Sequence, residues 1–300
     1  MTVKEEKERV EKILDGNEIT SIVALRSKIN RIEWYMTDWC NYRCSYCRTN
    51  HENQKLEKTE YYIEKAEQIK NKLNKDDKYL IYLKGGEVSF LDLEKILHTF
   101  DGYKVRFGIT TNLSNKLDYY ANLINNFNMK LVASYHEQSN PQDFIAKMAY
   151  LSYIQKKKKY ATNSFIMVSL VLSEEGFSKN YQYIYDKAKE LDIKTQVLPL
   201  KYKKEESKEK GKTSSIEPNL ELDKSFKTEI NGIPTHFSML QLPSVLKNFS
   251  PKGFNCQEKY YLYYNKDHFE GHRCQKDKEE TTIVCKKNEC DFCQVTKLWK

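Results

Sequence analysis

Apolar runs and amphipathic segments alternate over most of the chain. Short runs rich in β-branched and aromatic residues predict strands, whereas apolar residues spaced by three or four positions predict helices. The predicted strands are residues 32–37, 79–83, 105–110, 131–135, 165–172 and 195–200. The predicted helices between them are residues 60–73, 91–100, 117–127, 141–155 and 179–191. This alternation predicts an α/β fold with a parallel sheet, because helical crossovers join successive parallel strands.

Six such units predict a partial (β/α)6 barrel over residues 31–202, since a closed barrel of this kind needs more units. Its active site would lie at the carboxyl ends of the strands. Residues 203–249 are predicted to be a linker and bridging segment with a short helix at 237–246. Residues 250–300 form a small cysteine-rich extension, with a predicted hairpin that turns near residues 260–264.

The segment before the barrel, residues 1–30, is predicted to be a charged helix. Its apolar residues recur at roughly helical spacing, namely Val10, Ile13, Leu14, Ile22, Val23 and Leu25. No stretch has the uninterrupted apolar length that a membrane span needs, and residues 1–11 lack the apolar centre of a signal peptide. We therefore expect a cytoplasmic protein with no membrane partner.

Composition and charge narrow the class of protein further. Hydrophobic residues make up 39% of the chain and aromatic residues 13%, so a wholly disordered chain is excluded. The 50 Lys and Arg residues against 42 Asp and Glu residues give a net charge of +8, partly from lysine-dense stretches at 156–159 and 201–212. Solvated surface is the simpler interpretation of both stretches, and an RNA partner is left open without being indicated.

The eight cysteines fall into two groups, which are Cys40, Cys44 and Cys47 near the start and Cys256, Cys274, Cys285, Cys290 and Cys293 near the end. In a reducing compartment this usage favours metal or redox chemistry over structural disulfides. The first group has the spacing C-x3-C-x2-C directly after the first predicted strand. Three thiolates on one short loop can bind three irons of a [4Fe–4S] cluster and leave the fourth iron open. A structural zinc site usually requires four ligands.

This loop resembles the cluster loop of the radical S-adenosylmethionine (radical SAM) superfamily, whose signature is C-x3-C-x-aromatic-C, with Tyr46 as the aromatic residue. The resemblance covers residues 31–202 and implies the partial barrel of that family. It also implies that the open iron binds S-adenosylmethionine. The reduced cluster would then cleave S-adenosylmethionine to a 5′-deoxyadenosyl radical, which abstracts hydrogen from a substrate.

The resemblance extends to residues at the predicted strand ends. Gly85, Gly86 and Glu87 resemble the motif that binds the methionine amino group, although Val88 stands where proline is common. Asn112 resembles an element placed near S-adenosylmethionine. Ser134, with His136 on the same face of its strand, and Ser169 are the candidates for contact with the ribose.

The cysteines near the end of the chain resemble the SPASM and twitch extensions of radical SAM enzymes, which bind auxiliary [4Fe–4S] clusters. Cys256, Cys274, Cys290 and Cys293 match a twitch-type set of four ligands, and Cys285 can substitute for one of them. A four-cysteine zinc site is the alternative that this spacing also permits.

The resemblance implies an oxidoreductase that acts on a small metabolite or a peptide. The auxiliary cluster would oxidise the substrate radical or bind the substrate, and flavodoxin or ferredoxin would donate the electron. Only residues 1–30 precede the first barrel strand, and so short a segment favours a small molecule over a peptide as the substrate. Radical SAM modification of RNA and a radical SAM core with a structural zinc tail are the alternatives. No residue is assigned as a catalytic acid or base.

Overall fold

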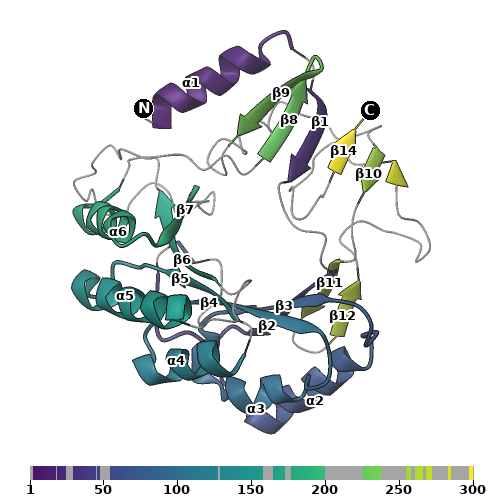
Figure 1. Ribbon diagram of the computed structural model, residues 1–300, viewed down its shortest axis with the longest axis vertical. Helices are drawn as coiled ribbons and strands as arrows, with labels where there is room; N and C mark the ends of the chain where they lie inside the picture. Colours follow the sequence, from purple (N-terminus) through teal and green to yellow (C-terminus); the bar gives the residue numbers. More distant parts are fainter. Residues whose placement is uncertain are drawn as a thin grey trace.

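The computed structural model describes residues 3–17, 19–24, 30–44, 46–47, 55–127, 129–157, 165–172, 177–199, 226–237, 255–257, 261–265, 268–271, 283–284 and 297–299. Within these residues the chain forms two sheets (Figure 1). The larger sheet has eight strands and the smaller has six. In the part of the chain that is described, no helix combines the length and the apolar character needed to cross a membrane.

The larger sheet contains the six predicted strands in chain order, all parallel to one another. They are β2 (Asn30–Thr37), β3 (Tyr79–Gly85), β4 (Val105–Thr111), β5 (Met129–Ser134), β6 (Phe165–Leu172) and β7 (Lys194–Pro199). The helices are α2 (Thr59–Lys70), α3 (Leu93–His98), α4 (Leu117–Asn126), α5 (Pro141–Lys157) and α6 (Lys179–Glu190). A short 3-10 turn, η1 (Val88–Phe90), follows β3. The predicted six-unit α/β fold is confirmed.

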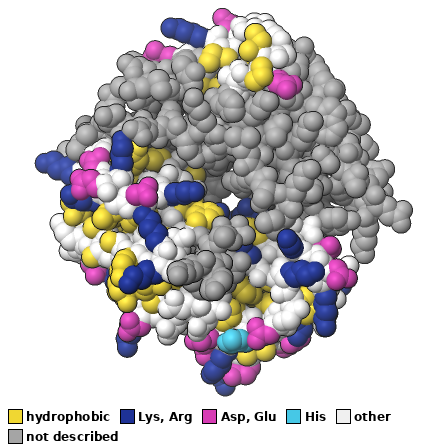
Figure 2. All heavy atoms as spheres, viewed as in Figure 1, with side chains coloured by type: hydrophobic (Ala, Val, Ile, Leu, Met, Phe, Trp, Pro, Cys, Tyr) yellow, Lys and Arg dark blue, Asp and Glu magenta, His cyan; other side chains and the backbone are white. Residues whose placement is uncertain are grey.

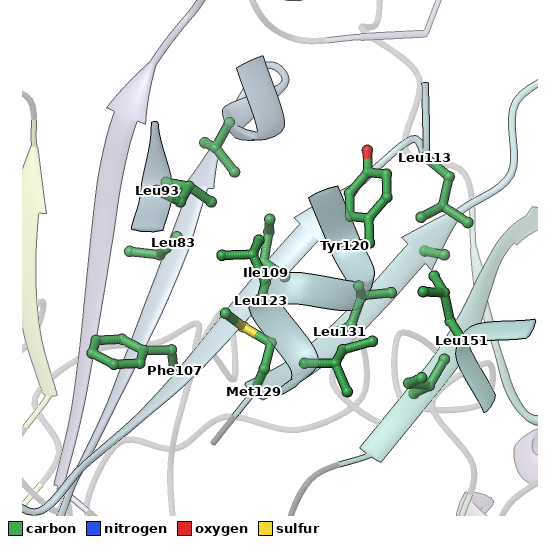
Figure 3. Close-up of a cluster of buried hydrophobic side chains, with 14 of the residues drawn as sticks. Leu83, Leu93, Phe107, Ile109, Leu113, Tyr120, Leu123, Met129, Leu131 and Leu151 are labelled. Carbon is green, nitrogen blue, oxygen red and sulfur yellow. The ribbon is translucent and has the colours of Figure 1, made fainter. Parts of the chain in front are cut away.

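All five helices lie on one side of this sheet (Figure 1). The strands place apolar side chains toward them at every second position, so Leu83, Ile109 and Leu131 join one buried cluster with residues of the helices. Figure 3 shows Tyr120 and Leu123 of α4 among these side chains. The helices do not cover the opposite face of the sheet, which we call its inner face (Figure 1).

A hairpin from the end of the chain extends the larger sheet. Its strands are β11 (Tyr261–Asn265) and β12 (His268–Gly271), and β11 lies parallel to β2 with Tyr263 opposite Glu33. The hairpin predicted from residues 260–264 toward Cys274 is present, with residues 261–265 as its first strand rather than its turn. Part of the predicted extension 250–300 is built into the barrel sheet.

The smaller sheet is antiparallel and joins segments that are far apart in sequence. In spatial order its strands are β13 (Ile283–Val284), β10 (Asn255–Gln257), β14 (Lys297–Trp299), β1 (Ile19–Ala24), β8 (Phe226–Ile230) and β9 (Ile233–Phe237). Figure 2 shows Lys, Arg, Asp and Glu side chains interspersed over the described surface.

Two sequence predictions are wrong in this sheet. Helix α1 (Val3–Leu14) ends well before residue 30, and residues 19–24 are strand β1. The apolar residues of so short a stretch fit more than one period, and their pairing partners lie more than 200 positions away, as Ile22 opposite Leu298 shows. Residues 226–237 are a hairpin rather than a linker, with Asn231 and Gly232 both at positive φ in the turn.

Two other predictions fall wholly or largely outside the described residues. Phe237 ends strand β9, and the remainder of the helix predicted over 237–246 is not described. The linker predicted from residue 203 is described only from residue 226.

Candidate metal and cofactor site

The cysteine loop begins where β2 ends, and two glycines at the end of β3 lie against it. The backbone N–H of Gly86 donates to the carbonyl of Thr37 at 2.8 Å, and the N–H of Glu87 donates to the carbonyl of Trp39 at 2.7 Å. Gly85 has a φ of +149°, and a Cβ on Gly86 would lie 2.1 Å from the carbonyl oxygen of Trp39. Only glycine permits this approach, which fixes the start of the loop.

The three cysteines of this loop line one cavity of about 180 Å³. The cavity lies at the carboxyl ends of neighbouring parallel strands, where the sequence predicts the site. Its lining residues are Cys40, Tyr42, Cys44, Tyr46, Cys47, Gly85, Gly86, Glu87, Thr110, Thr111, Asn112, Ser134 and His136. The cavity therefore collects every predicted site residue of the barrel except Ser169.

The thiol groups of the loop are half-buried. The sulfur of Cys40 accepts a hydrogen bond from the backbone N–H of Tyr42 at 3.4 Å, and the sulfur of Cys44 lies 3.4 Å from Nδ1 of His136. Burial raises the pKa of the Cys40 thiol and raises the pKa of the Cys44 thiol to about 11. Without a metal, Cys44 is therefore a neutral thiol near pH 7, and metal binding must displace its proton.

The donor set fits an iron–sulfur cluster. All three cysteines are free of disulfides, and they open into the same cavity. Among the described residues, no group of three or more His, Cys, Asp or Glu side chains converges as a site for a single metal ion. A cubane cluster does not require its protein ligands to converge on one point. Each iron binds one thiolate, so the ligating sulfurs lie further apart than the ligands of a single metal ion.

Glu87 is a buried carboxylate that connects the turn after β3 to the end of β4. Its Oε1 accepts from the backbone N–H of Ser89 at 3.1 Å and from the hydroxyl of Thr111 at 2.8 Å, and its Oε2 accepts from the N–H of Asn112 at 2.6 Å. Burial raises the pKa of Glu87, and these hydrogen bonds oppose that rise. A carboxylate accepts about four hydrogen bonds, so one more donor can be accommodated from the cavity side.

Asn112 ties the end of β4 to the cysteine loop. Its Nδ2 donates to Oδ1 of Asn41 at 3.0 Å and lies 3.9 Å from the sulfur of Cys40. Its Oδ1 accepts from the backbone N–H of Ser114 at 3.0 Å. The side chain is thus held in place at the wall of the cavity.

Tyr46 and His136 form another part of the cavity wall. The Tyr46 hydroxyl lies 2.5 Å from Nδ1 of His136, and the two rings are stacked with centroids 6.0 Å apart. The Tyr46 hydroxyl also lies 3.5 Å from the hydroxyl of Tyr181, which donates to the carbonyl of Tyr135 at 3.1 Å. Burial lowers the pKa of His136 to about 4 and raises the pKa of Tyr181 to about 12, so all three groups are neutral near pH 7.

The two predicted ribose contacts differ in position. Ser134 lines the cavity, whereas Ser169 is paired with it on the neighbouring strand and is buried. The hydroxyl of Ser169 accepts from Nε2 of Gln196 at 3.1 Å. Sequence reasoning did not assign Tyr42 to the site, although its place between the cysteines is a signal. It also missed Tyr181, which lies on α6 and has no sequence signal.

The second predicted metal site cannot be assembled from the described residues. Cys256 lies on strand β10, and nothing is described of its side chain. The other four tail cysteines lie outside the described residues, namely Cys274, Cys285, Cys290 and Cys293.

Together the fold and the site define an α/β protein with a thiol-lined cavity at the carboxyl edge of a parallel sheet. No protein-family model matches the chain, and no curated protein is similar to it in sequence.

Comparison with solved structures finds partial matches. Streptococcus suis SuiB bound to S-adenosylmethionine is 16% identical with a TM-score of 0.47, over 61% of this chain and 44% of SuiB. Histidine-tagged anSMEcpe with bound AdoMet is 18% identical with a TM-score of 0.44, over 63% of this chain and 54% of that chain. SuiB bound to the precursor peptide SuiA is 16% identical with a TM-score of 0.45, over 66% of this chain and 43% of SuiB. The alignments thus span about half the length of these proteins, and the chemistry of this chain must rest on its own residues.

Proposed function

We propose that this chain is a radical SAM enzyme that cleaves S-adenosylmethionine reductively and abstracts hydrogen from a small metabolite or a peptide. One observation carries the proposal. The cavity lined by Cys40, Cys44 and Cys47 is also lined by the Gly85–Glu87 segment and by Asn112. These residues come from separate strand ends and match the family pattern one by one. A chance C-x3-C-x2-C spacing would not bring the other motifs to the same cavity.

Cys40, Cys44 and Cys47 would hold a [4Fe–4S] cluster. When bound together with S-adenosylmethionine, the cluster supplies one-electron reductive cleavage, which yields methionine and a 5′-deoxyadenosyl radical. The protein would position the cluster and S-adenosylmethionine and keep water away from them. The two glycines hold the loop close to β3, and the neutral walls made by Tyr46 and His136 limit water around it.

The polar residues of the cavity would bind the parts of S-adenosylmethionine. The remaining acceptor position of Glu87 suits the positively charged methionine amino group, because a buried carboxylate favours a cationic donor. Asn112 and Ser134 line the cavity on the adjacent strand ends and would contact the rest of the molecule. Ser169, one strand further, would act through Ser134 rather than at the cavity surface.

The auxiliary site is the second part of the proposal. Cys256, Cys274, Cys290 and Cys293 would ligate one further [4Fe–4S] cluster, which accepts an electron from the substrate radical or binds the substrate. An oxidoreductase with flavodoxin or ferredoxin as electron donor would follow from the first of these roles.

The first test is product formation by the full chain after anaerobic reconstitution with iron and sulfide. With dithionite and S-adenosylmethionine, we expect 5′-deoxyadenosine, measured by liquid chromatography and mass spectrometry. Cys44→Ala should lose the product to background, because it removes a cluster ligand. Cys285→Ala, the matched change at the cysteine outside the four-ligand set, should retain it. Product from Cys44→Ala at the level of the unaltered chain would refute the cluster assignment.

Metal content separates the two tail alternatives. About eight irons per chain with equal sulfide would mean two [4Fe–4S] clusters, whereas about four irons with one zinc would mean a structural zinc tail. Cys290→Ala should lose the second metal group and keep the first. Zinc without iron in the unaltered chain would contradict the enzyme proposal as a whole.

A further inference from the structure

The inner face of the larger sheet carries an unbalanced set of charges. Strands β2 to β7 contain one acidic residue, Glu33, and five basic residues, which are Arg31, Lys84, Arg106, Lys130 and Lys194. The basic residues alternate along the strands with the apolar residues that face the helices, as Arg106 does with buried Phe107. They therefore lie on the face that the helices leave uncovered (Figure 1).

The strand register brings these side chains together. Glu33, Tyr82, Gly108, Lys130 and Phe165 form one continuous row across five strands. Arg31 and Arg106 lie in the row below, and Lys194 lies opposite Met167 in the row above.

Three of the cations surround one aromatic ring, that of Phe165. Lys130 Nζ lies 4.6 Å from the ring centroid, Lys194 Nζ lies 5.8 Å away, and the guanidinium carbon of Arg106 lies 5.9 Å away. Three like charges placed around one ring repel one another, so this arrangement favours an anion among them.

Glu33 is the one acidic residue of these strands, and two of the five cations pair with it. It is buried, and its partners are Arg31 at 2.9 Å and Lys84 at 2.5 Å. Nε and Nη2 of Arg106, and Nε of Arg31, are buried and have no hydrogen-bond acceptor among the described residues. A buried guanidinium donor without an acceptor is destabilising, so its retention points to a ligand that supplies the acceptor.

The cationic cluster adjoins the thiol-lined cavity. The ring of Tyr82 lies under Lys130, with 5.6 Å between the ammonium and the ring centroid, and its hydroxyl lies 3.0 Å from Oγ1 of Thr110. Thr110 lines the cavity. Gly108 makes this possible, because a Cβ there would lie 2.3 Å from the Tyr82 ring. From Lys130 to Ser134 at the cavity, strand β5 rises by roughly 13 Å, which is the length of a small metabolite or a short peptide segment.

We propose that this inner face binds an oxyanion of the substrate, a carboxylate or a phosphate, and that Arg106, Lys130 and Lys194 hold it. The proposal deepens the proposed function and rests on it, since the substrate would reach from this cluster to the cavity. A guanidinium group can pair with either oxyanion through two parallel hydrogen bonds, which would satisfy Nε and Nη2 of Arg106 together. Figure 2 shows Lys and Arg side chains beside an opening near the centre of the molecule.

The test measures anion binding by the reconstituted full chain without any radical chemistry. The melting temperature is titrated with sodium phosphate and, in a second arm, with sodium succinate, each against sodium chloride of the same ionic strength. Arg106→Met keeps an unbranched apolar stem and removes the guanidinium group with its charge. Lys187→Met removes a charge at an exposed pair with Glu190 on α6 and serves as the matched control.

We expect phosphate or succinate to raise the melting temperature above the chloride control, and the arm with the larger rise identifies the oxyanion. In Arg106→Met the apparent dissociation constant should increase by about tenfold or more, while Lys187→Met retains the affinity of the unaltered chain. Without anions, Arg106→Met should melt no lower than the unaltered chain, because two buried donor groups without acceptors have been removed.

Equal melting temperatures in phosphate, succinate and chloride would overturn the proposal, and so would equal affinities of Arg106→Met and the unaltered chain. Formation of 5′-deoxyadenosine is measured separately on the unaltered chain. If that product forms and no anion binds, only this inference fails. If anions bind and the product does not form, the oxyanion site stands and the radical SAM assignment fails.

Discussion

At the scale of a single residue, the surroundings of Cys44 lower the reactivity of its thiol. Its half-buried sulfur lies beside His136 in the wall of the cavity, and burial is the main cause of its raised pKa of about 11. Because a thiolate is the form that binds metal, the unloaded loop is kept in a less reactive state than an exposed cysteine loop would be.

This state can be measured by alkylation of the metal-free chain. A pKa raised from 9.0 to about 11 means that the thiolate fraction at pH 8 falls by about 100-fold, so iodoacetamide should modify Cys44 slowly at pH 8 and faster as the pH approaches 11. Peptide mass spectrometry over that pH range gives the profile, with the urea-unfolded chain as control. Equal rates in the folded and the unfolded chain at pH 8 would show that the fold does not protect this thiol.

At the scale of elements, the junction between β3 and the cysteine loop depends on the absence of a side chain. Gly86 faces the carbonyl oxygens of Asp38 and Trp39 so closely that any Cβ meets backbone atoms. Backbone cannot move aside as a flexible side chain can, so a substitution must open the junction itself.

Gly86→Ala should therefore lower the free energy of unfolding by about 3 kcal/mol or more and reduce the iron bound on reconstitution. Gly102→Ala is the control, because it adds the same methyl group where no atom lies within 4 Å. Because Gly102 has a positive φ, this alanine should lower the free energy of unfolding by about 1 kcal/mol, and iron binding should be unchanged. Urea unfolding and an iron assay give both quantities, and equal losses in the two variants would contradict the close approach.

Local pattern predicted the elements whose partners are close in sequence. The alternation of strand and helix from residue 30 to residue 199 needs only short-range signals, and the structure confirms its order. The strand at residues 19–24 was predicted as helix, because nothing near Ile22 in sequence reveals its partner Leu298. The Asn231-Gly232 turn is a recognisable hairpin signal, and it lies in the stretch that was predicted only as a linker and bridging segment.

The candidate site was predictable to the extent that its motifs end strands. Cys44, Glu87 and Asn112 follow predicted strands and meet at one cavity, as parallel-sheet geometry requires. The contact between Tyr46 and Tyr181 could not be predicted, because helix α6 approaches the loop only through tertiary packing. The inner-face cations were also missed, since single charges on separate strands form no pattern until the register is known.

At the scale of the whole molecule, the final third of the chain completes both sheets. Strand β11 covers the edge of β2, and β14 lies between β1 and β10 in the smaller sheet. The strand that leads into the cysteine loop is therefore an interior strand only because of residues 261–265.

Removal of residues 255–300 should expose that edge. We expect faster amide hydrogen exchange across residues 30–37 in the shortened chain, because the β11 partner is lost, while β5, which lies between β4 and β6, keeps its protection. Hydrogen–deuterium exchange with mass spectrometry on both chains measures this, and β5 is the internal control. Unchanged exchange in β2 would contradict the pairing with β11.

The same pairing has a consequence for how the protein is made. A ribosome adds roughly 5–20 residues per second, so strand β1 waits about 14–55 s after its own synthesis before residue 299 of β14 exists. Strand β2 and the three thiols that follow it wait nearly as long for β11. During that interval the nascent chain presents an unpaired strand edge and oxidisable sulfurs to the cell, which makes translation the period in which chaperones and, under the proposed function, iron–sulfur delivery would have the most effect.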